Sequence, residues 1–301
     1  MALLTTAPTI NVKWPITEIM LVMVAIFWGT SYGLTKESLF FTSILLFITI
    51  RFSLTFLCMI PIVVRDFRRG LNKDWKVALP SGLILSSIFL CEVYGVSETT
   101  ASKAAFLISL SVILTAFAEP IINRVSIPSS LLMLAFCSIF GVYLLTNPTS
   151  STFSLNTGDY FILLAAALRA VLVTATKRLS EGKSITTSTL TAIQSFVVAF
   201  SAMLLCLITQ PLETITLPVE PQFWLTMVYL ILFCTLFAFY IQNYAIRRLS
   251  PTKVSLLMGS EPLFGAIFAI IWLNEALTIT QILGAALIFA SVLITSINAN
   301  K

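Results

Sequence analysis

Ten long apolar segments, joined by short polar connections, constrain this 301-residue chain more than any other feature. They span residues 17–35, 41–63, 77–97, 103–122, 128–147, 158–176, 186–209, 222–245, 254–273 and 279–297. About 20 apolar residues suffice for a helix to cross the hydrocarbon core of a bilayer. Only 10% of the residues are charged, far below the usual share in soluble domains. The sequence therefore predicts an all-α polytopic membrane protein of ten transmembrane helices, surrounded by the lipid bilayer.

The placement of basic residues predicts how these spans are oriented. One side of the predicted bundle carries nearly all arginines and lysines of the connections, whereas the other side keeps only Lys36 and Lys103. Because cationic short loops stay in the cytoplasm, we expect both termini inside and a multi-pass protein of the cell (inner) membrane. The net charge of +5 lies between apolar spans, and so we expect no nucleic-acid partner.

An internal repeat divides the chain into halves of five spans. Lys36 and Lys177 end the first and sixth spans in the same register, and Lys103 and Lys253 open the fourth and ninth. With five spans each, the halves enter the membrane in opposite senses. We therefore expect residues 1–149 and 150–301 to form two inverted five-helix repeats, as in many secondary transporters, whose sites lie near the midplane between the repeats.

Short motifs along nearly the whole chain resemble one transporter family. They are Trp28-Gly29, Arg51-Phe52, Ala101–Leu107, Gly141–Thr146, Gly158-Asp159, Gln194, Thr235–Gln242, Glu261-Pro262, Asn274-Glu275 and Gln281–Gly284. In combination they resemble the EamA family of the drug/metabolite transporter (DMT) superfamily. The resemblance implies an inner-membrane carrier, commonly an exporter of amino acids or other small metabolites. Arg169 departs from it, because family members usually have an aromatic or small residue there.

Two arginines are expected near the membrane midplane. Arg51 and Arg169 each lie about ten residues, or roughly 15 Å, from the outer end of their spans. An arginine at this depth costs at least about 2.5–3.5 kcal/mol if it faces lipid, so both should point inward. Each could bind a carboxylate or phosphate of a solute or pair with an internal carboxylate. We favour internal pairing for Arg51 and solute binding for Arg169.

Two Glu-Pro dipeptides lie in the cytoplasmic half of related spans, Glu119-Pro120 and Glu261-Pro262. A carboxylate at membrane depth normally faces a partner or a water-filled cavity, and proline bends a helix. These glutamates could load and release a proton as the carrier cycles or act as gates. They could instead be fixed by an ion pair with Arg51 or Arg169, or by a hydrogen bond, and this fixed arrangement is favoured.

Aromatic residues provide further material for a binding pocket. Trp28 and Tyr32 share a helix face because they are four residues apart, and we expect them to shape the pocket together with Tyr244. Glu92 lies in the outer third of its span, where it could line a vestibule or reach the membrane interface. We favour the interface for Glu92.

The missing residue types narrow the function. The chain has no histidine, and its five cysteines lie in apolar segments without a CxxC pair, so we expect no metal, no cofactor and no enzymatic activity. We predict a secondary transporter that exports a small organic solute, an amino acid or a related anionic or zwitterionic compound, by alternating access. Proton coupling and a homodimer are left open. The alternatives are an uptake carrier for a nucleotide-like or other host metabolite, an intramembrane enzyme and a channel.

Overall fold

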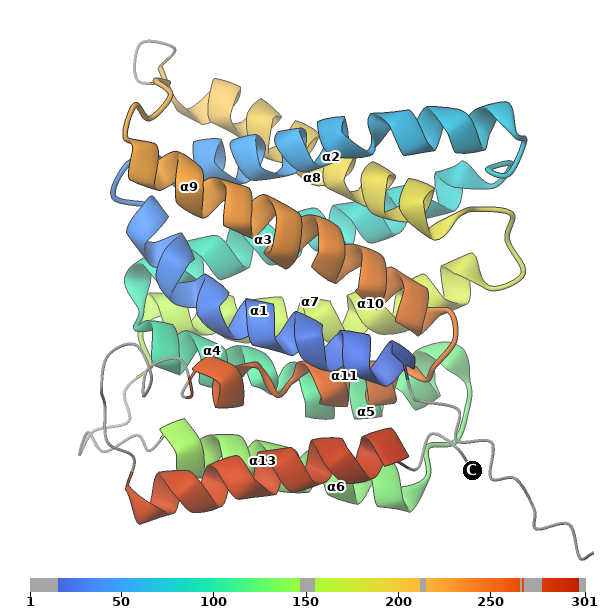
Figure 1. Cartoon of the computed structure of the whole chain (residues 1–301), viewed down its shortest axis with the longest axis vertical. Helices are drawn as coiled ribbons and strands as arrows, with labels where there is room; N and C mark the ends of the chain where they lie inside the picture. The colour runs from blue at the N-terminus through green and yellow to red at the C-terminus, as the bar shows by residue number, and fades with distance from the viewer. Residues whose placement is uncertain (1–15, 147–154, 212–214, 266, 268–277, 298–301) are drawn as a thin grey trace, which may run out of the picture.

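The structure, a computed structural model, describes residues 16–146, 155–211, 215–265, 267 and 278–297. Within these ranges the chain forms helices and no β-strand, and the long helices run side by side (Figure 1). The predicted all-α fold is therefore confirmed. The predicted boundary between residues 149 and 150 lies outside the described residues.

The first repeat contains five helical segments, one of which is interrupted. They are α1 (Ile16–Ser38), α2 (Ile44–Arg68), α3 (Ala78–Glu98), α4 (Ala101–Ser109) with α5 (Ser111–Asn123), and α6 (Ser129–Thr146). A short 3-10 turn, Trp75–Val77, leads into α3. These helices coincide with the first five predicted spans to within a few residues at each end.

The second repeat follows the same order. It contains α7 (Thr157–Ser180), α8 (Thr187–Thr209), α9 (Pro221–Tyr229), the π-helix η3 (Leu230–Phe237), α10 (Ala238–Ile246), α11 (Pro251–Met258) and α13 (Ile279–Ile297). Elements α9, η3 and α10 form one apolar stretch, Pro221–Ile246. Most of the predicted span 254–273 beyond residue 265 lies outside the described residues.

Polar residues fix where many of these helices begin. A serine, threonine or asparagine side chain accepts a hydrogen bond from a backbone N–H of the first turn, which otherwise has no partner. These N-caps are Ser43, Thr100, Asn156, Thr186 and Ser250. At α7 the cap is reciprocal, because Asp159 also accepts from the backbone N–H of Asn156.

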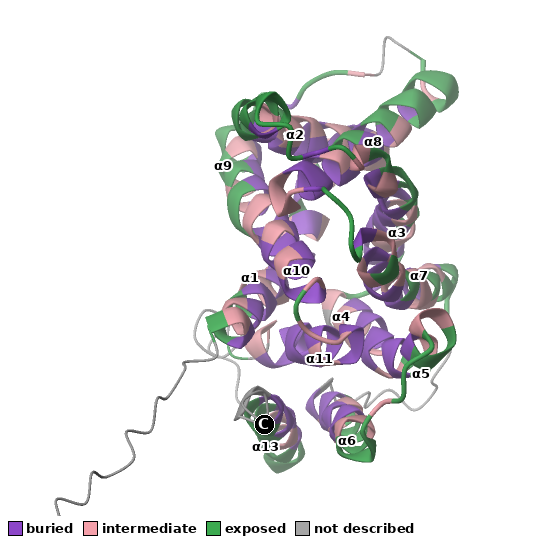
Figure 2. Cartoon of the chain, turned by 90° about the vertical axis from the view of Figure 1, so that its right-hand side faces the viewer, coloured by how far each residue is buried: buried purple, intermediate pink, exposed green. Residues whose placement is uncertain are grey.

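Seven helical segments are long and apolar enough to cross a membrane, and α6 and α13 contain shorter apolar stretches. Large apolar side chains such as Phe40, Ile121 and Leu225 point outward, as expected for a surface in contact with lipid. Buried faces turn toward the interior of the bundle, with α6 and α13 forming a pair at one side (Figure 2). The count of ten spans and the cytoplasmic termini stay predictions.

Two helices of the first repeat, α2 and α6, pack antiparallel against their counterparts in the second, α8 and α13. Helix α2 packs on α8: Ser43 before α2 donates to Gln210 after α8, and Asp66 near the end of α2 accepts from Thr186 before α8. Helices α6 and α13 also run antiparallel, with the backbones of Gly141 and Gly284 in close approach. Antiparallel counterparts are the signature of inverted repeats, so the predicted arrangement of the halves holds.

One helix of each repeat is interrupted at the same distance from its lysine. The interruption at Leu110 lies seven residues after Lys103, and that at Ser260 lies seven residues after Lys253. Each interruption contains a backbone hydrogen bond to the residue three positions earlier, as in a 3-10 turn. The N–H of Leu110 donates to the carbonyl oxygen of Leu107, and the N–H of Leu263 donates to that of Ser260. The paired lysines therefore mark corresponding broken helices, α4–α5 and the segment that starts with α11.

Candidate functional site

A central cavity lies between α1, α2, α3, α7 and α10, and both repeats contribute to its wall. Its polar lining includes Trp28, Tyr32, Arg51, Glu92, Arg169 and Gln242. The rest of the wall is mainly apolar, with residues such as Leu85 and Phe239. Charged side chains inside a membrane protein need partners or water, and in this cavity polar side chains of both repeats meet.

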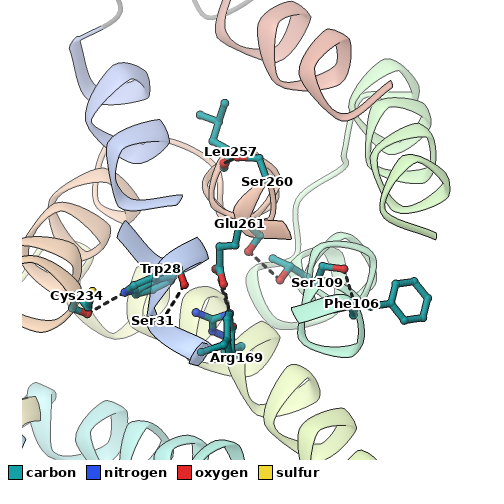
Figure 3. A network of polar contacts seen from close by, with 12 residues as sticks. Trp28, Ser31, Phe106, Ser109, Arg169, Cys234, Leu257, Ser260 and Glu261 are labelled. Atoms are coloured by element: carbon teal, nitrogen blue, oxygen red, sulfur yellow. Dashed lines mark hydrogen bonds and ion pairs between the residues drawn. The ribbon is translucent and has the colours of Figure 1, made fainter. Parts of the chain in front are cut away.

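Two residues of the cavity wall, Tyr32 and Arg169, form a network with the buried carboxylate of Glu261. Arg169 donates from Nη1 to Oε1 of Glu261 at 3.3 Å, and the hydroxyl of Tyr32 donates to Oε2 at 2.9 Å. Glu261 is 2% exposed. Figure 3 shows Glu261, which follows the interruption after α11, reaching toward Arg169. The structure thus shows Glu261 in an ion pair, one of the two arrangements predicted for it.

Trp28 also contacts Arg169. Its indole Nε1 donates to the carbonyl oxygen of Cys234 at 2.8 Å, which fixes the ring. The guanidinium of Arg169 lies 4.5 Å from the ring centroid, within the range of a cation–π contact. Trp28 and Tyr32 therefore share a helix face, as predicted, and the structure adds that Trp28 contacts Arg169 and Tyr32 contacts Glu261.

Arg51 lines the same cavity but has a different set of partners. Its Nε donates to the hydroxyl of Thr235 at 2.7 Å, and Nη2 donates to the carbonyl of Cys234 at 3.4 Å. Its guanidinium also lies 5.4 Å from the centroid of the Phe89 ring. Among the described residues no carboxylate forms an ion pair with Arg51, contrary to the pairing that we favoured. Neutral oxygens of the π-helix, an element frequent at functional sites, hold it instead.

Glu92 is part of the cavity wall, which corrects the favoured position at the membrane interface. The cavity face of α3 repeats every three or four residues, at Leu85, Ile88, Phe89, Glu92 and Val96. This spacing places all five on one face of a helix. The signal was present in the sequence, since Glu92 continues an apolar stripe that has to face the interior.

The two remaining predicted site residues lie elsewhere. Glu119, which is 3% exposed, accepts hydrogen bonds from the backbone N–H and the hydroxyl of Thr252 in the first turn of α11. This is the hydrogen-bonded arrangement predicted as one alternative. Tyr244 is not among the described residues that line the cavity. Its ring faces the guanidinium of Arg248 at 3.5 Å and stacks with Tyr240.

A smaller pocket lies on the other side of the ion pair. It is bordered by α4, α5, α7, α10, α11 and the interruption after α11. Its lining residues include Ser111 in α5, Ser255 in α11 and Glu261. Arg169 and Gln242 line both this pocket and the central cavity. The ion pair and Gln242 therefore form a polar partition between two spaces inside the bundle.

Polar contacts join the two repeats at both ends of the bundle. At the end that carries most arginines and lysines, the basic end, Lys253 pairs with Glu18 at 3.0 Å, and Arg178 donates to the carbonyl of Ile122. At the opposite end Lys103 pairs with Asp159. The central cavity therefore lies between two sets of contacts that join the repeats.

Comparisons with known proteins agree with this geometry. The sequence profile of the EamA-like transporter family matches residues 15–147 and again residues 156–297. A protein of Archaeoglobus fulgidus described as an uncharacterized transporter is 25% identical over 289 residues, which cover 95% of this chain and 88% of that protein. A solved crystal structure, 17% identical, superposes with a TM-score of 0.76 and covers 96% of this chain and 99% of its own, which shows the same fold.

Proposed function

Because the chain belongs to the EamA-like transporter family and is therefore a multi-pass membrane transporter, we propose that it exports a small organic metabolite in exchange for protons. The solute is an amino acid or a related compound with an anionic group. Transport proceeds by alternating access across the inner membrane. The observation that carries this proposal is the buried Arg169–Glu261 pair, which lies between two internal spaces.

The ion pair is suited to be opened by a solute. Nη1 of Arg169 contacts Glu261 at 3.3 Å, and the other donors of the guanidinium have no hydrogen-bond partner among the described residues, so they could form a bidentate contact with a carboxylate. Taking an ion pair out of water is costly, and an apolar pair of similar volume would often be as stable. A buried pair beside a cavity is therefore better explained by a role in transport than by stability.

A zwitterionic solute could separate the pair without leaving either charge alone. Its carboxylate would bind Arg169, and its ammonium group would face Glu261. When the solute leaves, the negative charge of Glu261 is neutralised either by the ion pair with Arg169 or by a proton. Because a proton on Glu261 removes the partner of the ammonium group, proton and solute compete for this carboxylate. Such competition is the basis of exchange, and an inward proton gradient would then drive export.

The test is release of solutes from proteoliposomes. Vesicles loaded with the twenty standard amino acids would be placed under an inward-directed pH gradient, and the released compounds would be identified by mass spectrometry. We expect wild-type protein to release a subset of them faster at acidic external pH. Glu261→Gln should lose this pH dependence, and an undiminished response to the gradient in this variant would overturn proton coupling through Glu261.

Folding and transport can be separated with paired substitutions. Removing one charge alone leaves a buried unpaired charge, which costs about 3–5 kcal/mol. Arg169→Gln combined with Glu261→Gln removes both charges, so this double variant should fold and yet fail to release any solute. Lys253→Gln combined with Glu18→Gln is the matched control, because it removes an ion pair outside the cavity and should keep the selectivity. Normal transport by the first double variant would exclude Arg169 as the anion site.

A further inference from the structure

The carboxamide of Gln242 in α10 has no hydrogen-bond partner among the described residues. The side chain is 2% exposed, and its Oε1 is fully buried without a donor. Folded proteins rarely leave a buried polar group unsatisfied, because it loses its hydrogen bonds with water and gains none in return. Seven buried side-chain atoms of the described residues lack a partner in this way, and Gln242 is the one among their residues that lines the central cavity and the smaller pocket.

A second buried glutamine, Gln194, provides a comparison, because its side-chain amide forms hydrogen bonds with neighbouring side chains. Gln194 in α8 accepts a hydrogen bond from Nδ2 of Asn243 at 2.7 Å and donates to the hydroxyl of Ser81 at 3.0 Å. Asn243 is the next residue after Gln242 in α10, so both amides belong to one region of the bundle. Neighbouring side chains form hydrogen bonds with Gln194, whereas among the described residues none does so with Gln242, which lines the central cavity and the smaller pocket.

The position of Gln242 points to a ligand. Gln242 and Arg169 line both the central cavity and the smaller pocket. The nearby carboxylate of Glu261 already accepts from Arg169 and Tyr32. Cationic arginines offer donors only, so the Oε1 of Gln242 is an acceptor at this partition that still requires a donor.

We propose that Gln242 is a specificity-determining residue whose Oε1 accepts a hydrogen bond from an amine or hydroxyl group of the solute. This inference rests on the proposed function, in which Arg169 holds the anionic group of the same solute. The preferred class is a carboxylate that carries a hydrogen-bond donor near the carboxyl group. A site built to bond such a donor rejects analogues that lack it, because the buried acceptor is then left without a partner. Since both residues line both spaces, the solute keeps these two contacts as it crosses the partition.

The test uses a mixture of matched carboxylates inside proteoliposomes. The mixture contains alanine, lactate and propionate, which differ only by an amine, a hydroxyl or a hydrogen at the second carbon, and the corresponding set built on leucine. Leak from protein-free vesicles is subtracted. We expect wild-type protein to release the amine- and hydroxyl-bearing members at least about tenfold faster than the unsubstituted acids, and Gln242→Leu to abolish this preference.

The controls separate loss of selectivity from loss of the fold. Gln242→Leu should unfold thermally no earlier than wild type because it breaks no hydrogen bond, whereas Gln194→Leu should unfold earlier. Gln242→Met, unbranched and similar in length, serves if the leucine variant does not fold. Equal release of all members by wild type, or a preference that persists in the Gln242 variants, overturns the role of Gln242 alone. No release of any member by wild type above protein-free vesicles overturns the proposed function as well.

Discussion

Each end of the molecule has a lysine–carboxylate ion pair between the two repeats, but the surroundings of the two pairs differ. Lys103 and Lys253 are the third residues of α4 and α11, and their partners Asp159 and Glu18 are the third residues of α7 and α1. The pseudosymmetry of the repeats thus relates the two ion pairs. They differ in what surrounds them, and this difference indicates how each end opens.

At the opposite end the charged contact and its neighbours share a single carboxylate, beside the neutral Ser43–Gln210 and Asn156–Glu98 hydrogen bonds. Asp159 accepts from Lys103, from the hydroxyl of Thr99 at 2.8 Å and from the backbone N–H of Asn156 at 2.8 Å. At the basic end they are spread over separate residues, among them Glu18, Glu119 and Asp66. In a concentrated closure the contacts share one residue, so a single substitution should weaken all of them. In a distributed closure the contacts involve separate residues, so the loss of any one of them should be tolerated.

The largest expected effect of a single substitution at either end comes from Asp159→Asn. The amide can accept at one position only, so either Thr99 or Lys103 loses its acceptor, and the ion pair is gone. Removing one partner of a buried pair costs about 3–5 kcal/mol, and we expect the lower part of this range because Lys103 is 28% exposed. Thermal unfolding in detergent measures the loss, and labelling of a Thr35→Cys variant in a cysteine-free background should accelerate. Unchanged labelling would contradict a concentrated closure.

Glu119→Ala is expected to have an intermediate effect. It removes an acceptor that holds both the N–H and the hydroxyl of Thr252, and leaving such buried donors unsatisfied costs about 1–3 kcal/mol. The start of α11 should loosen, while the pH dependence of transport stays because Glu119 lies outside the cavity. The measurement combines thermal unfolding with vesicle release across a pH series. Altered pH dependence would show that Glu119 takes part in proton exchange.

Glu18→Gln should have the smallest effect of the three. The amide oxygen can still accept from Lys253, which is 14% exposed, and the other contacts of the basic end remain, so the expected cost lies below the about 3–5 kcal/mol for a buried pair that loses one partner. The same unfolding assay, run beside Asp159→Asn, gives the comparison directly. Equal destabilisation by the two substitutions would remove the distinction between a concentrated and a distributed closure.

Much of the fold follows from the sequence because lipid leaves few choices. Every backbone polar group in a bilayer must be paired within the protein, so apolar segments of sufficient length become helices. The interruption at Leu110 was not predicted, since neither glycine nor proline marks it. Pro262 was expected to bend its helix, and the break lies just before it, at Gly259–Ser260. There Pro262 falls in the first turn of the following segment, where a missing N–H costs little.

Four residues of the cavity wall, Trp28, Tyr32, Arg51 and Arg169, were predicted from the sequence, but their contacts were not. Depth alone places Arg51 and Arg169 inside the bundle, because the energy of a charge in lipid depends on depth. Which carboxylate pairs with which arginine depends on how distant helices meet: Tyr32 and Glu261 lie 229 residues apart in the chain. Tyr244 illustrates the converse, since an aromatic residue near the end of a span has no periodic signal that separates a pocket from an interface.

The interrupted helices α4 and α11 have a mechanical consequence. Each is a short helix of eight or nine residues, about 12–14 Å long. The interruption lies at one end, and the ion-paired lysine lies near the other. A tilt of about 15° about the interruption moves the lysine end by roughly 3 Å, since a helix of this length works as a lever. That displacement exceeds the margin of a lysine–carboxylate contact. A small rotation at the interruption is therefore enough to separate each lysine from its carboxylate.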